Sequence, residues 1–503
     1  MTRRSGRSID TSGARVSRRD VFSAAALAAA APLFPAAAAA QGARPDAGAA
    51  ARVARANADP NRRVLLKGGT IISLDGQVGD LAQGDVLIEG KRIAAVASNI
   101  AASDAVIIDA SNTIVIPGFI DAHRHSWEGQ LRRINPNAPT LAAYSAATHL
   151  SFAKAYRPQD IYVGNLVTAL GCIDAGITCV IDNSHNARSA RHSDEAIRAL
   201  AEIGIRAVHA SGAPQAGDWD RQWPQDLERL KKQYFASDDQ LLTLRMFSAP
   251  DRDNWMAARR LGLRITTEFN GPRAAELIEP FVAERLLGPD NTFNHCGALP
   301  DRTWQHIRDA GVSVNVCPRS DSQYALGDGL SGFQKALDHG VKPGFSVDNE
   351  TSYGTDMFME MRVAFHIQRA LAASRKFNGE PAPPRPVSTR QVLECATVNG
   401  AICAGLAHKV GTLTPGKEAD IVLIRTDTVN LYPSNNAIGS VVAAADSRNV
   451  DTVIIAGRVA KLGGDIIGLD WGRFRRLVDE SRGYLFDKLG YRPDLFAEEF
   501  KLT

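Results

Sequence analysis

The stretch from residue 114 to residue 125, IVIPGFIDAHRH, constrains the fold more than any other part of this chain. Its apolar residues predict a buried strand over 114–116 that resumes after a Pro-Gly pair and ends in two histidines. Alternate residues of an extended strand point the same way, so His123 and His125 should project together. Two imidazoles at the C-terminal end of a strand are typical of a metal held at the catalytic face of a barrel.

This stretch resembles the opening strand of the amidohydrolase superfamily, which reads Pro-Gly, two apolar residues, Asp-x-His-x-His. The likeness continues through residues 292–299 (TFNHCGAL), 315–322 (NVCPRSDS) and 344–350 (GFSVDNE). The second of these resembles the Cys-Pro-x-Ser-Asn segment of the branch that includes cytosine deaminase and atrazine chlorohydrolase. It differs in having Asp321 where that branch has Asn. The resemblance implies a metal-dependent hydrolase and covers most of the chain.

Between residues 117 and 408, apolar strand runs alternate with helical stretches, which predicts an α/β fold with a (β/α)8 TIM-type barrel. After the opening strand, we expect seven more at 178–181, 205–209, 241–244, 264–267, 292–294, 313–316 and 344–347. Residues 62–116 and 409–470 carry further strand patterns. The resemblance implies that they form one small β-sandwich domain from both ends of the mature chain. A helical tail is expected over 471–503.

The N-terminus has the pattern of an export signal. Arg18 and Arg19 precede an alanine-rich apolar run and a small-residue end, so residues 1–40 are expected to be a signal peptide of the twin-arginine type. Two prolines, Pro32 and Pro35, leave the apolar run too short to span a membrane. Residues 41–61 are expected to be a linker. The sequence therefore predicts a periplasmic or secreted protein with no stable membrane span in its mature form.

Composition limits the partners. The formal net charge is only +3, and part of it belongs to the arginine-rich leader, so nothing indicates nucleic-acid binding. The six cysteines show no Cys-x-x-Cys pair and predict neither a disulfide framework nor a zinc finger. The expected partner is a small-molecule substrate, and a homo-oligomer stays open.

Asp348 ends the expected eighth strand, and the resemblance implies that it binds the metal and accepts a proton from the attacking water. A carboxylate beside the metal suits this chemistry, because a nucleophile must form near neutral pH. His295 ends the expected sixth strand, and the resemblance implies that it orients the water and polarises the reacting carbon. A helix-capping Asp and a structural histidine are the ordinary alternatives.

The fifth expected strand departs from the branch, which has a metal-binding His there and a proton-shuttling Glu three residues later. This chain has Glu268 and no histidine. If Glu268 is the ligand, the shuttle position falls on Gly271; if it is the shuttle, the ligand position falls on Ile265. We favour a ligand, because two histidines and one Asp alone leave an ion underbound. No Lys follows the fourth strand to bridge two ions, so we expect one divalent ion, with zinc the first choice and iron or manganese as alternatives.

Four further residues are candidates for the walls of the substrate pocket: Trp127, Asp182, His185 and Arg319. The first three follow barrel strands and should face the same mouth as the metal. The guanidinium of Arg319 could clamp a substrate carboxylate or carbonyl. Glu128 and His209 are further candidates of the same kind.

Together these patterns predict a hydrolase that acts on a carbon–nitrogen bond other than a peptide bond. If Glu268 binds the metal, no shuttle glutamate is left to supply the acid that ring deamination needs. A cyclic amide, carbamate or related carbonyl compound is therefore expected as the substrate slightly ahead of an aminated heterocycle. The alternative is deamination of an aminated heterocycle, as in cytosine deaminase. An alternative of another class is a non-catalytic scaffold on the same fold. Retention of both motif histidines, His295 and Asp348 argues against it.

Overall fold

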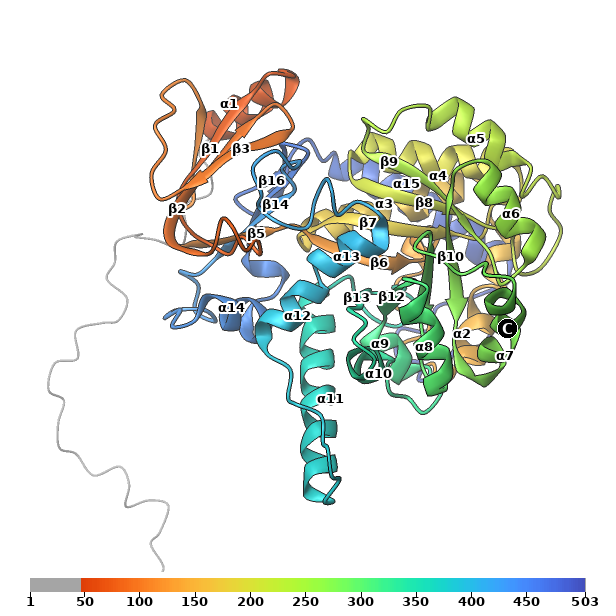
Figure 1. The fold of residues 1–503 in the computed structure, drawn as a ribbon. Coiled ribbons are helices and arrows are strands. Elements are labelled where there is room, and N and C mark those ends of the chain that lie inside the picture. Colours follow the sequence, from red (N-terminus) through yellow and green to blue (C-terminus); the bar gives the residue numbers. More distant parts are fainter. Residues whose placement is uncertain (1–46, 503) are drawn as a thin grey trace, which may run out of the picture. The chain divides into compact units, whose positions relative to one another are not determined.

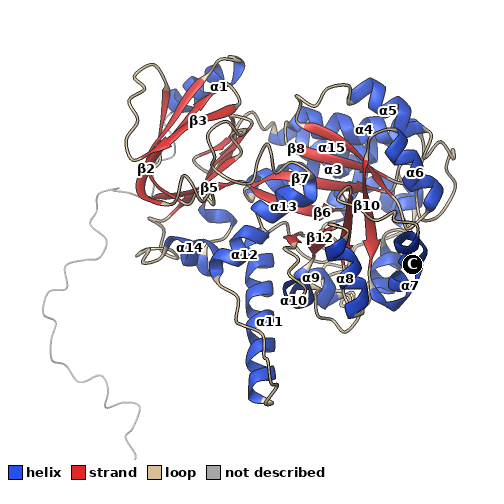
Figure 2. Cartoon of the chain, in the orientation of Figure 1, coloured by secondary structure: helices blue, strands red, loops and turns tan. Residues whose placement is uncertain are grey.

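The computed structural model describes residues 47–502, and the expected signal peptide lies outside these described residues. Two sheets organise the described residues (Figures 1 and 2). The eight-stranded sheet is entirely parallel and runs in sequence order from β6 to β13. Its strands are β6 (Phe119–Arg124), β7 (Ile177–Ser184), β8 (Arg206–Ser211), β9 (Leu242–Phe247), β10 (Arg264–Phe269), β11 (Asn291–His295), β12 (Ser313–Val316) and β13 (Gly344–Phe345). This confirms the barrel predicted from the sequence.

The two edges of this sheet meet just beyond β13. A parallel bridge joins Arg124 of β6 to Asp348. The backbone N–H of His125 donates to the carbonyl of Asp348 at 2.8 Å, and the N–H of Asp348 donates to the carbonyl of His123 at 3.0 Å. The seam that closes the barrel therefore fixes Asp348 between the two motif histidines.

Helices cover the outside of the barrel wall, and one short helix enters its lumen. Apolar residues of the helices from α4 (Ala190–Ile203) to α8 (Asp301–Asp309) pack with the outward-facing residues of the strands in one large core. Inside, two residues of α13 (Val398–Ala404), Ala401 and Cys403, pack against lumen residues such as Ile120 and Val208. Arg245 of β9 donates to the carbonyl of Cys403 at 2.9 Å and so caps this helix. The other end of the lumen is left for polar side chains.

The remaining elements have the following bounds: η1 (Ser126–Leu131), α2 (Leu141–Ala147), η2 (Phe152–Ala155), α3 (Pro158–Asp174), α4 (Ala190–Ile203), α5 (Asp226–Tyr234), α6 (Arg252–Arg260), α7 (Gly271–Ala283), α8 (Asp301–Asp309), α9 (Pro318–Gln323), α10 (Phe333–Asp338), α11 (Met357–Phe377), α12 (Thr389–Cys395), α13 (Val398–Ala404), α14 (Ala437–Gly439), η3 (Ser440–Ala444), η4 (Ser447–Asn449) and α15 (Trp471–Lys488). The expected C-terminal tail is thus helical over α15. Within residues 47–502, no helix is long and apolar enough to cross a membrane.

The second sheet combines both ends of the chain, as predicted. It contains β1 (Arg63–Ile71), β2 (Leu81–Glu89), β3 (Arg92–Ala97), β4 (Val106–Asp109), β5 (Thr113–Pro117), β14 (Ile421–Arg425), β15 (Val450–Ile455), β16 (Arg458–Leu462) and β17 (Asp465–Ile466). Strand β5 joins the two halves, because it pairs with β1 on one side and with β14 on the other.

The opening stretch is two strands in two sheets, β5 and β6, divided at Gly118, next to the domain boundary expected after residue 116. A Cβ on this glycine would lie 2.2 Å from Oγ1 of Thr178, so only glycine lets the chain pass here. The range expected to be a linker contains a helix, α1 (Ala47–Ala58). Val53 of this helix is buried in the core of the second sheet, and the side chain of Asn57 donates to the carbonyl of Val459 at 2.9 Å.

Candidate metal centre

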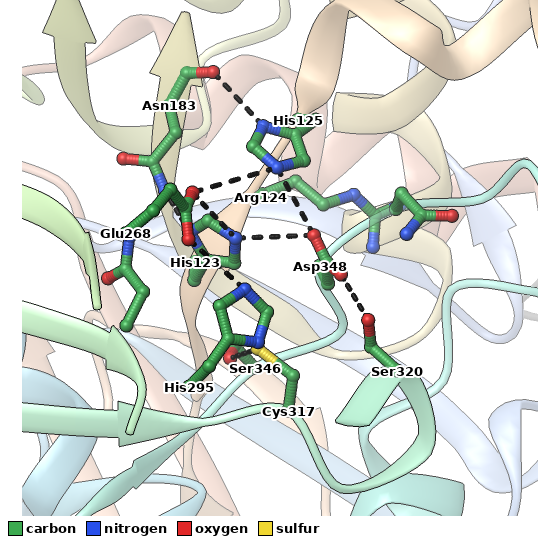
Figure 3. Close-up of polar contacts among 12 residues, drawn as sticks. His123, Arg124, His125, Asn183, Glu268, His295, Cys317, Ser320, Ser346 and Asp348 are labelled. Atoms are coloured by element: carbon green, nitrogen blue, oxygen red, sulfur yellow. Dashed lines mark hydrogen bonds and ion pairs between the residues drawn. The ribbon is translucent and has the colours of Figure 1, made fainter. Parts of the chain in front are cut away.

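Four predicted ligands converge at the C-terminal mouth of the barrel (Figure 3). Nε2 of His123 lies 3.4 Å from Oε1 of Glu268 and 3.2 Å from Oδ1 of Asp348. Nε2 of His125 lies 3.9 Å and 3.3 Å from the same two oxygens. These side chains come from β6, β10 and the segment after β13, so the barrel topology brings them together.

The donor atoms fit a metal ion. Zinc–ligand distances of about 2.0–2.2 Å in a tetrahedral site place the ligand atoms roughly 3.3–3.6 Å apart, close to the separations found here. Nε2 of His123, Oε1 of Glu268 and Oδ1 of Asp348 are all buried without a hydrogen-bond partner among the described residues. Buried polar atoms are rarely left unpaired, so three of them aimed at one point fit a site for a cation.

The position of Glu268 agrees with the ligand hypothesis, which stays a prediction. One carboxylate oxygen points at the histidine pair, and the other lies 3.1 Å from Nε2 of His295. Burial opposes ionisation, but the charge of His123 and the hydrogen bond from His295 lower the pKa of Glu268 to about 2. Three residues on, Gly271 begins α7 and offers no side chain to shuttle a proton.

His295 lies between two carboxylates. Its Nε2 faces Glu268, and its Nδ1 lies 2.7 Å from Oδ1 of Asp321. Asp321 also accepts the backbone N–H of Cys317 at 3.3 Å, which fixes the carboxylate in place. Burial opposes a charge on His295, but Cys317 and Asp321 raise its pKa well above the usual value. The residue that departs from the branch pattern is therefore the hydrogen-bond partner of the catalytic candidate.

Oδ1 of Asp348 faces Nε2 of His123 at the proposed ion position. Its Oδ2 accepts a hydrogen bond from the hydroxyl of Ser320. Burial opposes ionisation of Asp348, but the surrounding imidazoles, His123 foremost and then His125 and His295, hold its pKa well below the usual range. The backbone is left-handed at Asp348, with φ +72°, and at His295, with φ +66°. Such strained backbone at non-glycine residues is common at functional sites.

Two of the predicted pocket residues lie beside the site. Nε2 of His185 is 2.8 Å from Nδ1 of His125, and the ring of Trp127 is 5.9 Å from that of His185. Sequence reasoning missed His149, whose ring is 4.7 Å from that of His185. Glu128 is fully buried, and one of its oxygens accepts the hydroxyl of Tyr144 at 2.7 Å.

Asp182 takes a different position from the one expected. It shares a strand face with Val180, which packs in the outer core, whereas Ile181 faces the lumen. Asp182 accepts a hydrogen bond from Nδ1 of His209 at 2.9 Å, and both side chains are fully buried. The carboxylate therefore pairs with His209 on the outer side of the barrel wall.

Arg319 is also engaged away from substrate. Its guanidinium donates to the carboxylate of Glu360 on α11 and, at 3.0 Å, to the carbonyl of Gly354. It also stacks over the ring of Tyr353, 4.5 Å from the centroid. These contacts replace the expected role as a substrate clamp with one of holding α11 against the segment after β12.

Known proteins resemble the chain over most of its length. Residues 272–460 match the model of the Amidohydrolase family. A 5-methylthioadenosine/S-adenosylhomocysteine deaminase from Pyrococcus abyssi is 26% identical over 434 residues, which are 81% of this chain and 96% of the relative. A 5'-deoxyadenosine deaminase from Methanothermobacter thermautotrophicus is 27% identical over 429 residues, 81% of this chain and 95% of the relative.

Solved structures share the fold. An adenosine deaminase from Xanthomonas campestris with bound zinc superposes with a TM-score of 0.71 at 20% identity, covering 84% of this chain and 98% of that one. An atrazine chlorohydrolase from Arthrobacter aurescens complexed with zinc gives a TM-score of 0.68 at 22% identity, covering 84% and 100%.

Fold and site thus define a barrel hydrolase with a cluster of side chains at its mouth that could hold a metal ion. The class expected from the sequence, a hydrolase acting on carbon–nitrogen bonds other than peptide bonds, is confirmed at that level by the deaminases among the relatives. The family model supports the amidohydrolase superfamily over residues 272–460, and the solved structures share the fold.

Proposed function

We propose that this protein is a zinc-dependent deaminase of an aminated heterocycle, with the 6-aminopurine of adenosine derivatives as the first candidate. The observation that carries the proposal is the convergence of unpartnered ligand atoms from His123, Glu268 and Asp348. The deaminases among the relatives, which match most of this chain, support the substrate class. Zinc is supported by the zinc-bound structures of the same fold.

Each residue has a role in this reaction. A divalent ion held by the four ligands would lower the pKa of water and supply a nucleophile near neutral pH. Asp348 accepts the proton that the water loses. His295, between the carboxylates of Glu268 and Asp321, can carry a proton and deliver it to the departing amino group. Water adds to the ring carbon, and the proton that Asp348 accepts passes to the ring nitrogen. The amino group takes the proton of His295 and leaves as ammonia when the C–N bond breaks. The hydroxyl left on the ring carbon returns its proton to His295 and becomes the carbonyl.

The position of His295 reverses the order of the two reactions that the sequence predicts. The sequence favours carbonyl hydrolysis over deamination because Glu268, as a metal ligand, leaves no acid on β10. His295 contacts one carboxylate on each side and so replaces that acid at the same mouth. This contact favours deamination.

The test is ammonia release by zinc-loaded protein from a substrate panel. The panel should contain adenosine, 5'-methylthioadenosine, S-adenosylhomocysteine and 5'-deoxyadenosine, with cytosine, guanine and an aminotriazine as further amines. We expect ammonia from at least one adenosine derivative, abolished in Asp348→Asn. Turnover of none of the amines by protein that holds its metal would overturn the deaminase proposal.

Hydrolysis of a cyclic amide or carbamate is the second candidate. The observation that favours it is the absence of a shuttle carboxylate at Gly271, since an electrophilic carbonyl depends less on prior ring protonation. Adding a cyclic amide and a cyclic carbamate to the same panel separates the two. Ring opening without any ammonia release from the amines would select this candidate.

A further inference from the structure

Asn183 contacts both histidines of the His-x-His motif. Its side-chain amide lies against Nδ1 of His123, and its backbone carbonyl lies 3.3 Å from Nδ1 of His125 (Figure 3). Asn183 is fully buried in β7, directly beside β6. The β6–β7 register shifts between Asp121 and Arg124, within the stretch that carries His123. One residue thus lies behind two ligands.

The ring atoms define what Asn183 must supply. Both histidines turn Nε2 toward Glu268 and Asp348, so Nε2 must keep a free lone pair to bind an ion. The proton then sits on Nδ1 and needs an acceptor. For His125 two acceptors lie within reach of Nδ1: Nε2 of His185 at 2.8 Å and the backbone carbonyl of Asn183 at 3.3 Å.

For His123 the neighbour of Nδ1 is the side-chain amide of Asn183. The amide nitrogen faces Nδ1, and the amide oxygen Oδ1 is buried without a hydrogen-bond partner among residues 47–502. An Asn amide exchanges its oxygen and nitrogen by half a turn, and the hydrogen-bond network decides between the two orientations. A donating nitrogen would force the proton onto Nε2 of His123 and block the metal. An accepting oxygen leaves Nε2 free.

We infer that Asn183 is a positioning residue that holds both motif histidines in the tautomer with the proton on Nδ1. Its side chain sets His123, and its main chain acts together with His185 on His125. Partners of this kind raise the basicity of ligating histidines and fix their orientation, and their loss typically costs about 10–100-fold in metal affinity. The inference rests on the metal site of the proposed function but not on its substrate.

The experiment measures zinc affinity of the full-length mature protein by competition with a chromophoric chelator. Asn183→Leu keeps the volume and removes the acceptor, while Asn183→Asp keeps an acceptor and removes the donor. We expect the Leu variant to bind zinc about 10–100-fold more weakly and the Asp variant to bind at least as tightly as the wild type. Equal weakening in both, or unchanged affinity in the Leu variant, would overturn the inference.

A matched control is Asn186→Leu, because Asn186 is an equally buried amide in the next loop whose side chain has no hydrogen bond to a site histidine. Its zinc affinity should equal that of the wild type, and so should the melting temperatures of all metal-free variants. If the Leu variant does not fold, two-bond ¹H–¹⁵N spectra of histidine-labelled wild-type protein decide. A proton on Nε2 of His123 in the zinc-loaded protein would overturn the inference. Wild-type protein that binds no zinc would instead overturn the proposed function.

Discussion

Oε2 of Glu268 lies 3.1 Å from Nε2 of His295, so the carboxylate that faces the ion position also holds the imidazole expected to act on the substrate. One side chain thereby couples metal binding to proton transfer. The branch that the sequence resembles divides these tasks between a histidine and a glutamate on the fifth strand. In this chain Glu268 contacts both His123 of the proposed metal centre and His295.

Glu268→Gln should therefore weaken metal binding as well as turnover. The amide keeps the shape but loses the charge that attracts a cation, so the loss should exceed the roughly 10–100-fold typical of residues behind the ligands. The measurement is zinc affinity by chelator competition beside ammonia release. Retained zinc with lost turnover would mean that Glu268 shuttles protons. Glu268→His would restore the branch's ligand and should keep the ion.

Metal content is the second prediction. The ligands converge at one position, so purified protein should hold close to one ion per chain, and His123→Ala should lose it. Because the ion binds only the folded state, zinc at 100 times its Kd should stabilise folding by about 2.7 kcal/mol, seen as a rise in melting temperature. The same zinc should leave the melting temperature of His123→Ala unchanged. A firm stoichiometry of two would contradict the single site.

The sequence could group the proposed site residues because strand order in a barrel is regular. Residues that end parallel strands must meet at one mouth, which is why His123, His295 and Asp348 could be grouped without coordinates.

The sequence did not predict where the second barrel strand ends. The expected strand stops at residue 181, which would place Asp182 in the loop at the mouth, but β7 continues to Ser184. Within this longer strand Asp182 shares the outer face with Val180, and Asn183 faces the lumen.

Long-range partners were equally hidden. The free guanidinium expected at Arg319 is bound to Glu360, 41 residues later on a helix that no motif marks. The helix found in the expected linker owes its place to contacts of Val53 and Asn57 with strands about 400 residues away. Local composition carries no signal for either contact, because both depend on how distant elements pack.

Export is the third prediction. We propose that residues 1–40 direct the protein through the twin-arginine pathway, so Arg18→Lys with Arg19→Lys should trap the precursor in the cytoplasm. Cell fractionation and immunoblotting provide the measurement. A single conservative change elsewhere in the leader, Arg3→Lys, is the control and should leave export intact. Export of the doubly substituted precursor at the normal level would contradict the proposal.

The buried guanidinium of Arg206 should stabilise the junction between the two sheets. It donates to both oxygens of Asp420 at 2.9 Å and to Glu418 at 2.7 Å. Arg206→Met removes the cation that two buried carboxylates share, leaves Glu418 only the ammonium of Lys91 at 3.4 Å, and should cost about 3–5 kcal/mol of unfolding free energy. Burial opposes ionisation of Glu418, but Arg206 lowers its pKa below the usual 4.5. This stabilisation is present above pH 4.5 and lost as the pH falls through the lowered pKa. The difference in unfolding free energy between wild type and variant should therefore shrink under acid; a constant difference would contradict the assignment.

The last prediction concerns Asp321, which sits behind His295 at 2.7 Å. Asp321→Asn keeps an acceptor for Nδ1 but removes the negative charge that helps to raise the pKa of His295. If protonated His295 delivers the proton, kcat/KM falls as the pH rises through the pKa of this histidine. With a lower pKa, the variant should lose activity at a lower pH than the wild type. His295→Gln has no proton to give and should lose roughly 10²–10⁴ in rate at every pH, without that alkaline limb. Zinc content serves as the control, since neither change removes a proposed ligand. A variant at Asp321 with the wild-type pH profile and full metal would show that the charge behind His295 does not govern its protonation.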